Sequence, residues 1–456
     1  MTLEERIADP ERQLTELLRE NAALREENAR LRKEIEEWKR GFRERGKRRC
    51  SRPEGKSGSA PKKPGRKAGH LGATRPVPEQ IDGTVEHPAP ISCECGGATV
   101  ATDEAESVVV QDIPPVRVQN IRHVAPIRCC GRCGKRVAAK LPGAAPSGSS
   151  VAKVQLGPNV LAFALDLRFE RHVPLRGISS LLDTWFGLKV SAGGLSHLFD
   201  RWGIRSAASR QEILNRIRSS SVVGADETGL RQNGVSGWAW ILRTNEASYF
   251  RIELSRAEWV IASMLGDSFE GILCSDFYSV YTSHHDWIHA YCSAHTIREA
   301  KKIAELSPCP PTQEFRDRLR ALYRKGEEAQ ASGDLTARRG IRIQMGRLIA
   351  DSVLARHPEV ARLQARLHQH FHGVLTFLDH PDVPADNNAT ERDIRALAVH
   401  RKVTGGTRSP RGSQTLAHWM TISQTLKKND LPLRRFAIDL HQAHQESRPP
   451  PSVFAS

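Results

Sequence analysis

Hydrophobic residues recur every seven positions between residues 11 and 40, which predicts one long helix with an apolar seam. Two interleaved series form the seam: Leu17, Leu24, Leu31 and Trp38, and Leu14, Asn21, Asn28 and Ile35. A parallel coiled coil would bury this seam, and asparagines at core positions favour a dimer in one register. Residues 1–45 are therefore predicted to be a coiled-coil dimerisation helix. A helix packed on the protein's own body is the alternative.

Apolar and polar residues alternate from 107 to 129, in SVVVQDIPPVRVQNIRHVAPIRC, as they do in paired strands. Cysteines flank this alternation, namely Cys93 and Cys95 in CECGG and Cys129, Cys130 and Cys133 in CCGRCGK. Two cysteine pairs on turns suit a tetrahedral metal site. Residues 81–140 are predicted to be a cysteine-rich module that binds one structural Zn²⁺ through Cys93, Cys95, Cys130 and Cys133. Cys129 is the alternative to Cys93, and free structural thiols are the alternative to a metal.

Helical periodicity returns in residues 151–218, after a linker at 141–150 that is rich in Gly, Ser and Pro. Two apolar faces support it: Val160, Leu161, Ala164 and Leu165, then Ile178, Leu181, Leu182 and Trp185. A short glycine-containing break divides the second stretch, as in a helix-turn-helix. The segment is predicted to be a helical DNA-binding region, with a plain helical scaffold as the alternative.

Short apolar strands begin at residue 221. SVVGAD ends at Asp226, and GWAWILRT follows a turn that contains Asn233-Gly234. ASYFRIEL predicts a third strand, RAEWVIASMLGD a helix, and GILCSD a fourth strand that ends at Asp276. A helical crossover places the fourth strand parallel to the first. Both aspartates should therefore emerge at one edge of an α/β sheet, where such sheets carry their sites.

A third carboxylate, Glu391, lies in DNNATERDIR. Asn388-x-x-Glu391 fits a capping box, which is a purely structural device. However, Glu391 shares a helical face with Ile394, Leu397 and Ala398, and so points toward the core. An inward carboxylate needs a cation. A Mg²⁺ site shared by Asp226, Asp276 and Glu391 is the preferred interpretation.

The net charge of +16, from 68 Lys and Arg against 52 Asp and Glu, indicates a polyanionic partner, with nucleic acid first. Residues 46–80 are predicted to be a basic flexible linker, in which Lys62, Lys63, Arg66 and Lys67 contact a phosphate backbone or are only solvated. HRKVTGGTRSPRG offers a second set of DNA contacts, Lys402, Arg408 and Arg411, with a solvated loop as the alternative. No apolar run reaches about 18 residues and no signal peptide opens the sequence, so a reducing cytoplasm and no membrane are expected.

Three long blocks resemble the catalytic blocks of IS66-family transposases: ADETGLRQNGVSGWAWIL, GILCSDFYSVY and LDHPDVPADNNATERDIRALAVHRKVTGGTRSPRGSQT. The resemblance implies an α/β fold, an RNase H-like DDE catalytic domain at 219–436. It also implies a helical insertion at about 297–378, and a C-terminal tail is expected at 437–456. YCSAH resembles the Cys-x-x-His of many DDE enzymes, here Cys292 and His295 with Arg298 behind them. One departure is Cys93-x-Cys95, where the family usually has Cys-x-x-Cys.

The resemblance implies a transposase that cuts at element ends and joins the DNA 3′-OH to target DNA by two-metal phosphodiester transfer. Asp226 would bridge two Mg²⁺ or Mn²⁺ ions, with Asp276 on one and Glu391 on the other. Glu227 is expected to support the metal ligands from behind, and Asp386 to be a turn residue. The implied partners are terminal inverted repeats, target DNA, a second copy of the chain and possible accessory proteins of the element, in a bacterial cytoplasm at the nucleoid. The alternatives are an RNase H-fold nuclease without strand transfer and a catalytically inert DNA-binding dimer.

Overall fold

The computed structural model describes residues 22, 26, 27, 29, 30, 75–103, 105–114, 116–138 and 154–454. The chain divides into two units, Met1–Asp112 and Ile113–Ser456. Five described residues fall in the predicted coiled coil, and all five are helical. The rest of that helix lies outside the described residues, as do the linker residues Lys62, Lys63, Arg66 and Lys67. The dimer seam and the basic linker therefore stay predictions.

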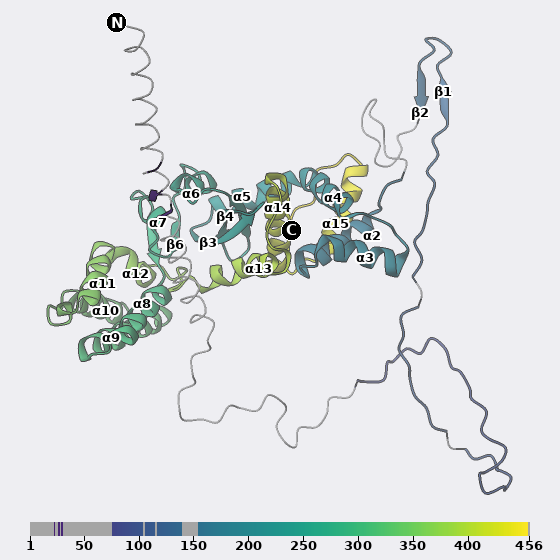
Figure 1. Cartoon of the computed structure of the whole chain (residues 1–456), viewed down its shortest axis with the longest axis horizontal. Coiled ribbons are helices and arrows are strands. Elements are labelled where there is room, and N and C mark those ends of the chain that lie inside the picture. Colours follow the sequence, from purple (N-terminus) through teal and green to yellow (C-terminus); the bar gives the residue numbers. More distant parts are fainter. Residues whose placement is uncertain are drawn as a thin grey trace, which may run out of the picture. The chain divides into compact units, whose positions relative to one another are not determined.

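The cysteine-rich segment contains less strand than its alternation predicts. In the second unit, β1 (Ile127–Cys129) pairs antiparallel with β2 (Arg136–Ala138) in a short hairpin (Figure 1). The described residues from 107 to 126 form no strand, so the prediction is wrong for that stretch. Their apolar side chains are open to solvent, and Ile121 is 71% exposed. Alternation produces a strand only where a neighbouring strand and a covering layer receive the apolar face, and the described residues provide neither here.

A five-stranded mixed sheet forms the centre of the second unit (Figure 1). Its order is β5-β4-β3-β6-β7, with strands β3 (Val222–Gln232), β4 (Val235–Arg243), β5 (Ser248–Glu253), β6 (Ile272–Ser275) and β7 (Ile288–Tyr291). The first three strands form an antiparallel meander. The turn between β3 and β4 has Asn233 and Gly234 at φ of 51° and 82°. Helix α6 (Glu258–Leu265) then crosses over, and β6 lies parallel to β3. The predicted order of strands and helix is confirmed.

Two details of the sheet differ from the predictions. Asp226 lies within β3 rather than at its end, because pairing with β4 continues and places Asp226 opposite Ile241. The parallel pairing with β6 stops earlier, at Gly224 and Cys274, so Asp226 lies just beyond it. The sequence pattern does not predict strand β7, because its four residues are too few for an alternation to be recognised. Asp276 directly follows β6, as predicted.

The edge strand β5 is covered by α14 (Pro410–Lys428). The Ser248 N–H donates to Thr425 Oγ1 at 3.1 Å, and the Phe250 N–H donates to Thr421 Oγ1 at 2.9 Å. Two threonine hydroxyls on successive turns of the helix thus satisfy outward-facing donors of the edge strand.

The predicted helical region 151–218 is confirmed as helical. It contains α2 (Pro158–Leu165), the π-helical η1 (Asp166–Glu170), α3 (Leu175–Phe186), α4 (Ala192–Arg205) and α5 (Ala207–Arg218). Residues 187–191 separate α3 from α4, where the glycine-containing break was expected. Side chains of these helices share one core with the sheet and α14, among them Phe169, Phe199, Trp240 and Trp419. The region is therefore packed onto the five-stranded sheet and shares its core.

Residues 437–456 are not a tail, because α15 (Leu433–Gln445) occupies much of that stretch. Phe436, Leu440 and, beyond the helix, Val453 are buried in the same core, and α15 contacts α2. The four-residue spacing of Phe436 and Leu440 is an ordinary amphipathic signal.

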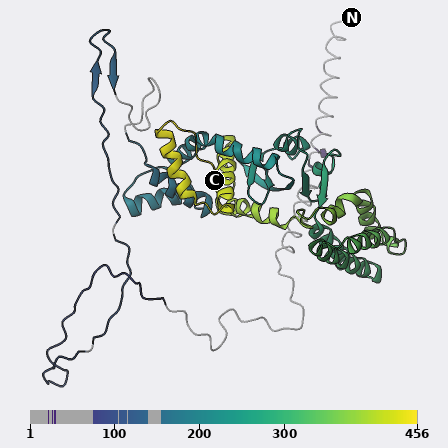
Figure 2. The same ribbon diagram turned by 180° about the vertical axis from the view of Figure 1, so that it is seen from behind.

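The predicted helical insertion is a bundle of α8 (Ser293–Leu306), α9 (Pro310–Ser332), α10 (Leu335–Ile349), the short η2 (Leu354–Arg356), α11 (Pro358–Gln369) and α12 (Phe371–Asp379). It stands to one side of the sheet, opposite α2, α3 and α15, in both views (Figures 1 and 2). A second core fills it, including Phe315, Leu319, Met345 and Leu367. None of the helices in the described ranges is long and apolar enough to cross a membrane.

Candidate metal and nucleic-acid site

Helix α13 (Asn388–Thr404), which carries Glu391, begins directly on β3. Asn387 is its N-cap residue, and the Asn387 side-chain amide donates to the Ala225 carbonyl at 2.8 Å. The Asn387 backbone N–H donates to Cys292 Sγ at 3.1 Å. Because the helix begins one residue earlier than a capping box at Asn388 requires, Glu391 does not cap it, and the capping-box alternative is wrong.

The approach of α13 to β3 is close enough to require glycine. A Cβ on Gly224 would lie 2.1 Å from Thr390 Oγ1 and 3.1 Å from Asn387 Oδ1. Any side chain at 224 would push the first turn of α13 away from the strand that carries Asp226.

Glu391 faces the first turn of α8. Its Oε1 lies 3.5 Å from His295 Nε2 and 3.7 Å from Arg298 Nη2, and it has no hydrogen-bond partner in the part of the chain that the structure describes. The Glu391 side chain is 27% exposed. The Cys-x-x-His motif thus has two separate parts: Cys292 is buried and accepts the Asn387 N–H, whereas His295 approaches the carboxylate.

Asp226 is surrounded by the other acidic groups. Burial first, then the charge of Glu227, and after it those of Asp276 and Glu391, raise the pKa of Asp226 to about 7. Its Oδ1 accepts the Glu227 N–H at 2.8 Å, while Asp276 Oδ1 accepts the Tyr278 N–H at 2.9 Å. Carboxylates that disfavour one another's charge are stabilised by a cation among them, and an all-oxygen donor set suits Mg²⁺ or Mn²⁺. The predicted triad therefore fits such an ion.

The other two nearby acids are occupied differently. Glu227 is 4% exposed, and its two oxygens accept hydrogen bonds from Arg256 and Tyr281, each at 2.5 Å. Asp386 accepts the Asn388 N–H at 3.0 Å and is a turn residue, as predicted. Over the described residues, no three His, Cys, Asp or Glu side chains are gathered tightly enough to form a ready metal cluster, so the ion sites stay predictions.

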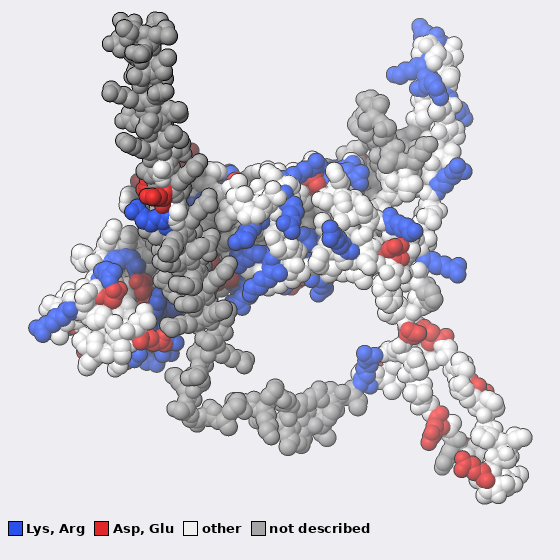
Figure 3. Space-filling view, viewed as in Figure 1, with Lys and Arg blue, Asp and Glu red and all other residues white. Residues whose placement is uncertain are grey.

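A cleft of about 490 Å³ opens beside the carboxylates. Its lining combines Asp226, Glu227 and Glu391 with the basic side chains His295, Arg298, Arg395, Arg401 and Lys402. Arg401 is held to β3 by Thr228 Oγ1, whereas Arg395 and Lys402 are exposed on α13. Figure 3 shows Lys and Arg side chains over the region of α13 and α14. Arg395 was missed in the sequence, although it lies one helical turn after Glu391.

The two other predicted DNA contacts follow α13, Arg408 in the loop and Arg411 in the first turn of α14. Thr407 docks this loop on the β3–β4 hairpin, since its N–H donates to the Arg231 carbonyl at 2.9 Å. Arg408 is exposed there. Arg411, in the first turn of α14, pairs with Asp200 of α4. Lys402 and Arg408 are thus open to a ligand, while Arg411 also joins two helices.

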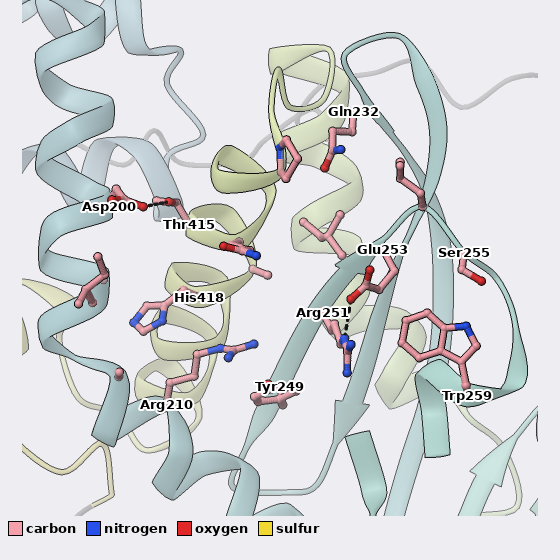
Figure 4. Close-up of a pocket in the computed structure, with 18 residues that line it drawn as sticks. Asp200, Arg210, Gln232, Tyr249, Arg251, Glu253, Ser255, Trp259, Thr415 and His418 are labelled. Atoms are coloured by element: carbon pink, nitrogen blue, oxygen red, sulfur yellow. Dashed lines mark hydrogen bonds and ion pairs between the residues drawn. The ribbon is translucent and has the colours of Figure 1, made fainter. Parts of the chain in front are cut away.

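A larger cleft, of about 890 Å³, lies between α4, α5, β5 and α14 (Figure 4). Arg210, Tyr249, Arg251, Trp259 and His418 line it together with Asp200 and Glu253. None of the three predicted metal ligands lines this cleft.

The predicted zinc ligands lie on tight turns within their separate units. In the first unit, the Gly96 N–H donates to the Cys93 carbonyl at 2.9 Å, and hydrogen bonds from the Cys95 backbone and side chain lower the pKa of Cys93. In the second unit, Cys130 begins the turn between β1 and β2, and hydrogen bonds from the Arg132 and Cys133 backbone lower its pKa. Cys93, Cys95, Cys129, Cys130 and Cys133 are all exposed. Backbone N–H groups directed at sulfur favour thiolates, the form that binds zinc.

Comparison with known proteins gives a family and several relatives. The family model described as "Transposase IS66 family" matches residues 153–415, more than half of the chain. Three uncharacterized proteins of Sinorhizobium fredii are similar. Protein y4jO is 27% identical over 31% of this chain and 44% of its own length; y4jD is 23% identical over 74% and 71%, and y4hP is 24% identical over 80% and 73%. The family match includes all three predicted metal ligands, the insertion, Lys402 of α13 and Arg408 in the loop that follows. The chain belongs to the IS66 family of transposases.

Proposed function

We propose that this IS66-family protein is a DDE transposase with an RNase H-like catalytic domain, which cuts at element ends and joins the DNA 3′-OH to target DNA. The observation that carries the proposal is the cleft that Asp226 of β3 and Glu391 of α13 line together, with Asp276 directly after β6, the parallel neighbour of β3. The antiparallel meander followed by a parallel strand, with α13 against β3, supports the RNase H-like assignment.

Asp226, Asp276 and Glu391 are the residues that would hold two Mg²⁺ or Mn²⁺ ions. When bound, these ions supply Lewis acidity that activates a water or a 3′-hydroxyl and stabilises the leaving oxygen. His295 and Arg298 lie within 3.7 Å of Glu391 Oε1, so the Arg298 charge stands beside this carboxylate. The protein's remaining task is to place phosphates beside this site.

The basic wall of the cleft suits that task. Arg298, Arg395 and Lys402 lie on the rim of the same cleft as Glu391, and Arg408 follows in the docked loop. Cations there neutralise phosphates without reading sequence. Double-stranded DNA is thus the proposed partner, with end recognition assigned to the α3–α4 region, the zinc module and the linker.

A joining assay tests the proposal. DNA with an element end and a labelled 3′-OH is incubated with a plasmid target, Mg²⁺ and the full chain. A transposase transfers the label to the plasmid, a nuclease only shortens the DNA, and an inert binder does neither. The two latter outcomes would each replace the proposal by its named alternative.

Asp226→Asn, Asp276→Asn and Glu391→Gln are each expected to lower the cleavage rate by about a thousandfold or more, since each removes charge from the metal site and hardly alters shape. The affinity for DNA, measured by fluorescence anisotropy, should stay close to that of the wild type. Near wild-type cleavage by Glu391→Gln would remove Glu391 from the triad.

A further inference from the structure

A set of contacts centred on the buried Glu227 carboxylate joins three chain segments beside the two aspartates, and its arginine, Arg256, is 37% exposed. Glu227 follows Asp226 in β3, and its Oε1 accepts hydrogen bonds from both Nε and Nη2 of Arg256, at 3.2 and 2.5 Å. Its Oε2 accepts the hydroxyl of Tyr281, a residue of α7 (Ser279–Thr282), at 2.5 Å. Glu227 is 4% exposed and Tyr281 1% exposed. Both carboxylate oxygens are thus occupied by protein donors.

The Arg256 guanidinium is fixed by two rings as well. Its Cζ lies 4.1 Å from the Trp238 ring centroid and 3.8 Å from that of Tyr278. Tyr278 belongs to the loop of Asp276: its backbone N–H donates to Asp276 Oδ1, and its hydroxyl donates to the Arg256 carbonyl at 3.4 Å. A cation between two aromatic faces is held in position as well as in charge.

The sheet itself leaves a gap at this place. Pairing between β3 and β6 ends at Gly224 and Cys274, before either aspartate. Side-chain contacts must therefore hold the Asp276 loop against β3.

We infer that Glu227, Arg256 and Tyr281 form a clamp that positions Asp276 relative to Asp226, so that the two carboxylates can share metal ions. The inference rests on the proposed metal site and adds three positioning residues to it. Glu227 is the fixed anion of the clamp and no metal ligand. Arg256 neutralises Glu227 and carries the Tyr278 loop, while Tyr281 fixes the second oxygen.

The sheet provides a matched control. Arg251 of β5 bonds to Glu253 at 2.9 Å and lies 5.4 Å from the Trp259 ring, in the larger cleft (Figure 4). It reproduces the Arg, Glu and Trp chemistry of the clamp where no predicted metal ligand lies. If the loss of any arginine–carboxylate pair weakened Mn²⁺ binding, changes at Arg251 and at the clamp would weaken it alike. If the clamp positions Asp276, only changes in the clamp should weaken Mn²⁺ binding.

The test measures Mn²⁺ binding to the full chain without DNA, from the electron paramagnetic resonance signal of free Mn²⁺. Tyr281→Phe is expected to weaken Mn²⁺ binding about tenfold, as loss of a group that orients metal ligands does, and Arg251→Lys to leave it unchanged. Cleavage by Tyr281→Phe should recover toward the wild-type rate as Mn²⁺ is raised. Thermal unfolding establishes that each variant is folded.

Wild-type Mn²⁺ affinity in folded Tyr281→Phe overturns the clamp and leaves the proposed function standing. Should Tyr281→Phe not fold, Arg256→Lys takes its place, since lysine keeps the charge but loses the second N–H to Glu227. Wild-type affinity there overturns the clamp equally. Asp226→Asn separates the two levels: if it binds Mn²⁺ as wild type does, the proposed metal site fails, and the clamp fails with it.

Discussion

At residue 224, the absence of a side chain allows α13, the helix that carries Glu391, to approach β3. Gly224→Ala would place Cβ 2.1 Å from Thr390 Oγ1, so the first turn of α13 must shift. We expect a loss of about 1–3 kcal/mol in unfolding free energy and a marked fall in cleavage. Gly340→Ala is the control, because nothing lies within 4 Å of a Cβ there.

The second variant in this experiment is Gly224→Ala combined with Thr390→Ala, which removes the clashing hydroxyl. Urea unfolding and the cleavage rate should both recover toward wild type. A Gly224→Ala protein as stable and as active as wild type would show that α13 does not depend on this approach.

Sequence reasoning at this scale identified acids better than it identified their partners. Asp276 and Glu391 stand out because a carboxylate after an apolar strand, or on a core-facing stripe, requires an explanation. The hydrogen bond between Asn387 and Cys292 joins residues 95 positions apart and carries no local pattern. The same is true of Tyr281 and Glu227, 54 positions apart.

Among the elements, helix α13 carries a buried histidine, His400, in addition to Glu391. His400 is fully buried, and neither ring nitrogen has a hydrogen-bond partner within the described residues. Burial first, then Arg168 and His172, lower the pKa of His400 from 6.5 to about 3. The unfolded chain takes up this proton below pH 6.5 and the folded protein only near pH 3, so stability from this group is lost as pH falls from 6.5 toward 3.

His400→Phe should therefore flatten the acid limb of the stability curve, by about 1.4 kcal/mol per pH unit between 6 and 4. The phenyl ring keeps the stacking partner Phe169 and brings no polar atoms. Urea unfolding at several pH values measures the slope, with the exposed His368→Gln of α11 as control. An unchanged slope in His400→Phe would contradict the assignment.

Periodicity predicted elements well where they are long or end in a clear turn. The meander, the crossover and the insertion helices follow from it, since the apolar positions of each face one of the two cores. Strand lengths do not, because β3 continues past Asp226 for as long as β4 pairs with it. The alternation at 107–126 shows the converse, a strand pattern without a partner.

For the molecule as a whole, zinc should decide whether residues 90–140 fold. Metal analysis of reduced protein is expected to give about one Zn²⁺ per chain, and chelation should unfold this segment while the sheet keeps its circular dichroism. Only one of Cys93→Ser and Cys129→Ser should lower the zinc content. An ordered segment in zinc-free protein would refute the module.

Residues 11–40 should hold two copies together. In sedimentation, a chain that begins at residue 80 is expected to lose far more mass than the deleted segment, because the dimer separates. Replacing Asn21 and Asn28 by Ile should raise stability but relax the number of chains in the assembly. A loss of only the deleted mass would indicate that the helix packs on its own chain.

The threonine contacts on β5 have a consequence for solubility. An uncovered sheet edge favours fibre growth, since a second molecule can add a strand to its unpaired backbone groups. The backbone N–H groups of Ser248 and Phe250 donate to Thr425 and Thr421. They therefore cannot pair with an added strand while α14 covers β5. Two hydroxyl groups of one helix thereby keep this edge of the sheet from pairing with a second molecule.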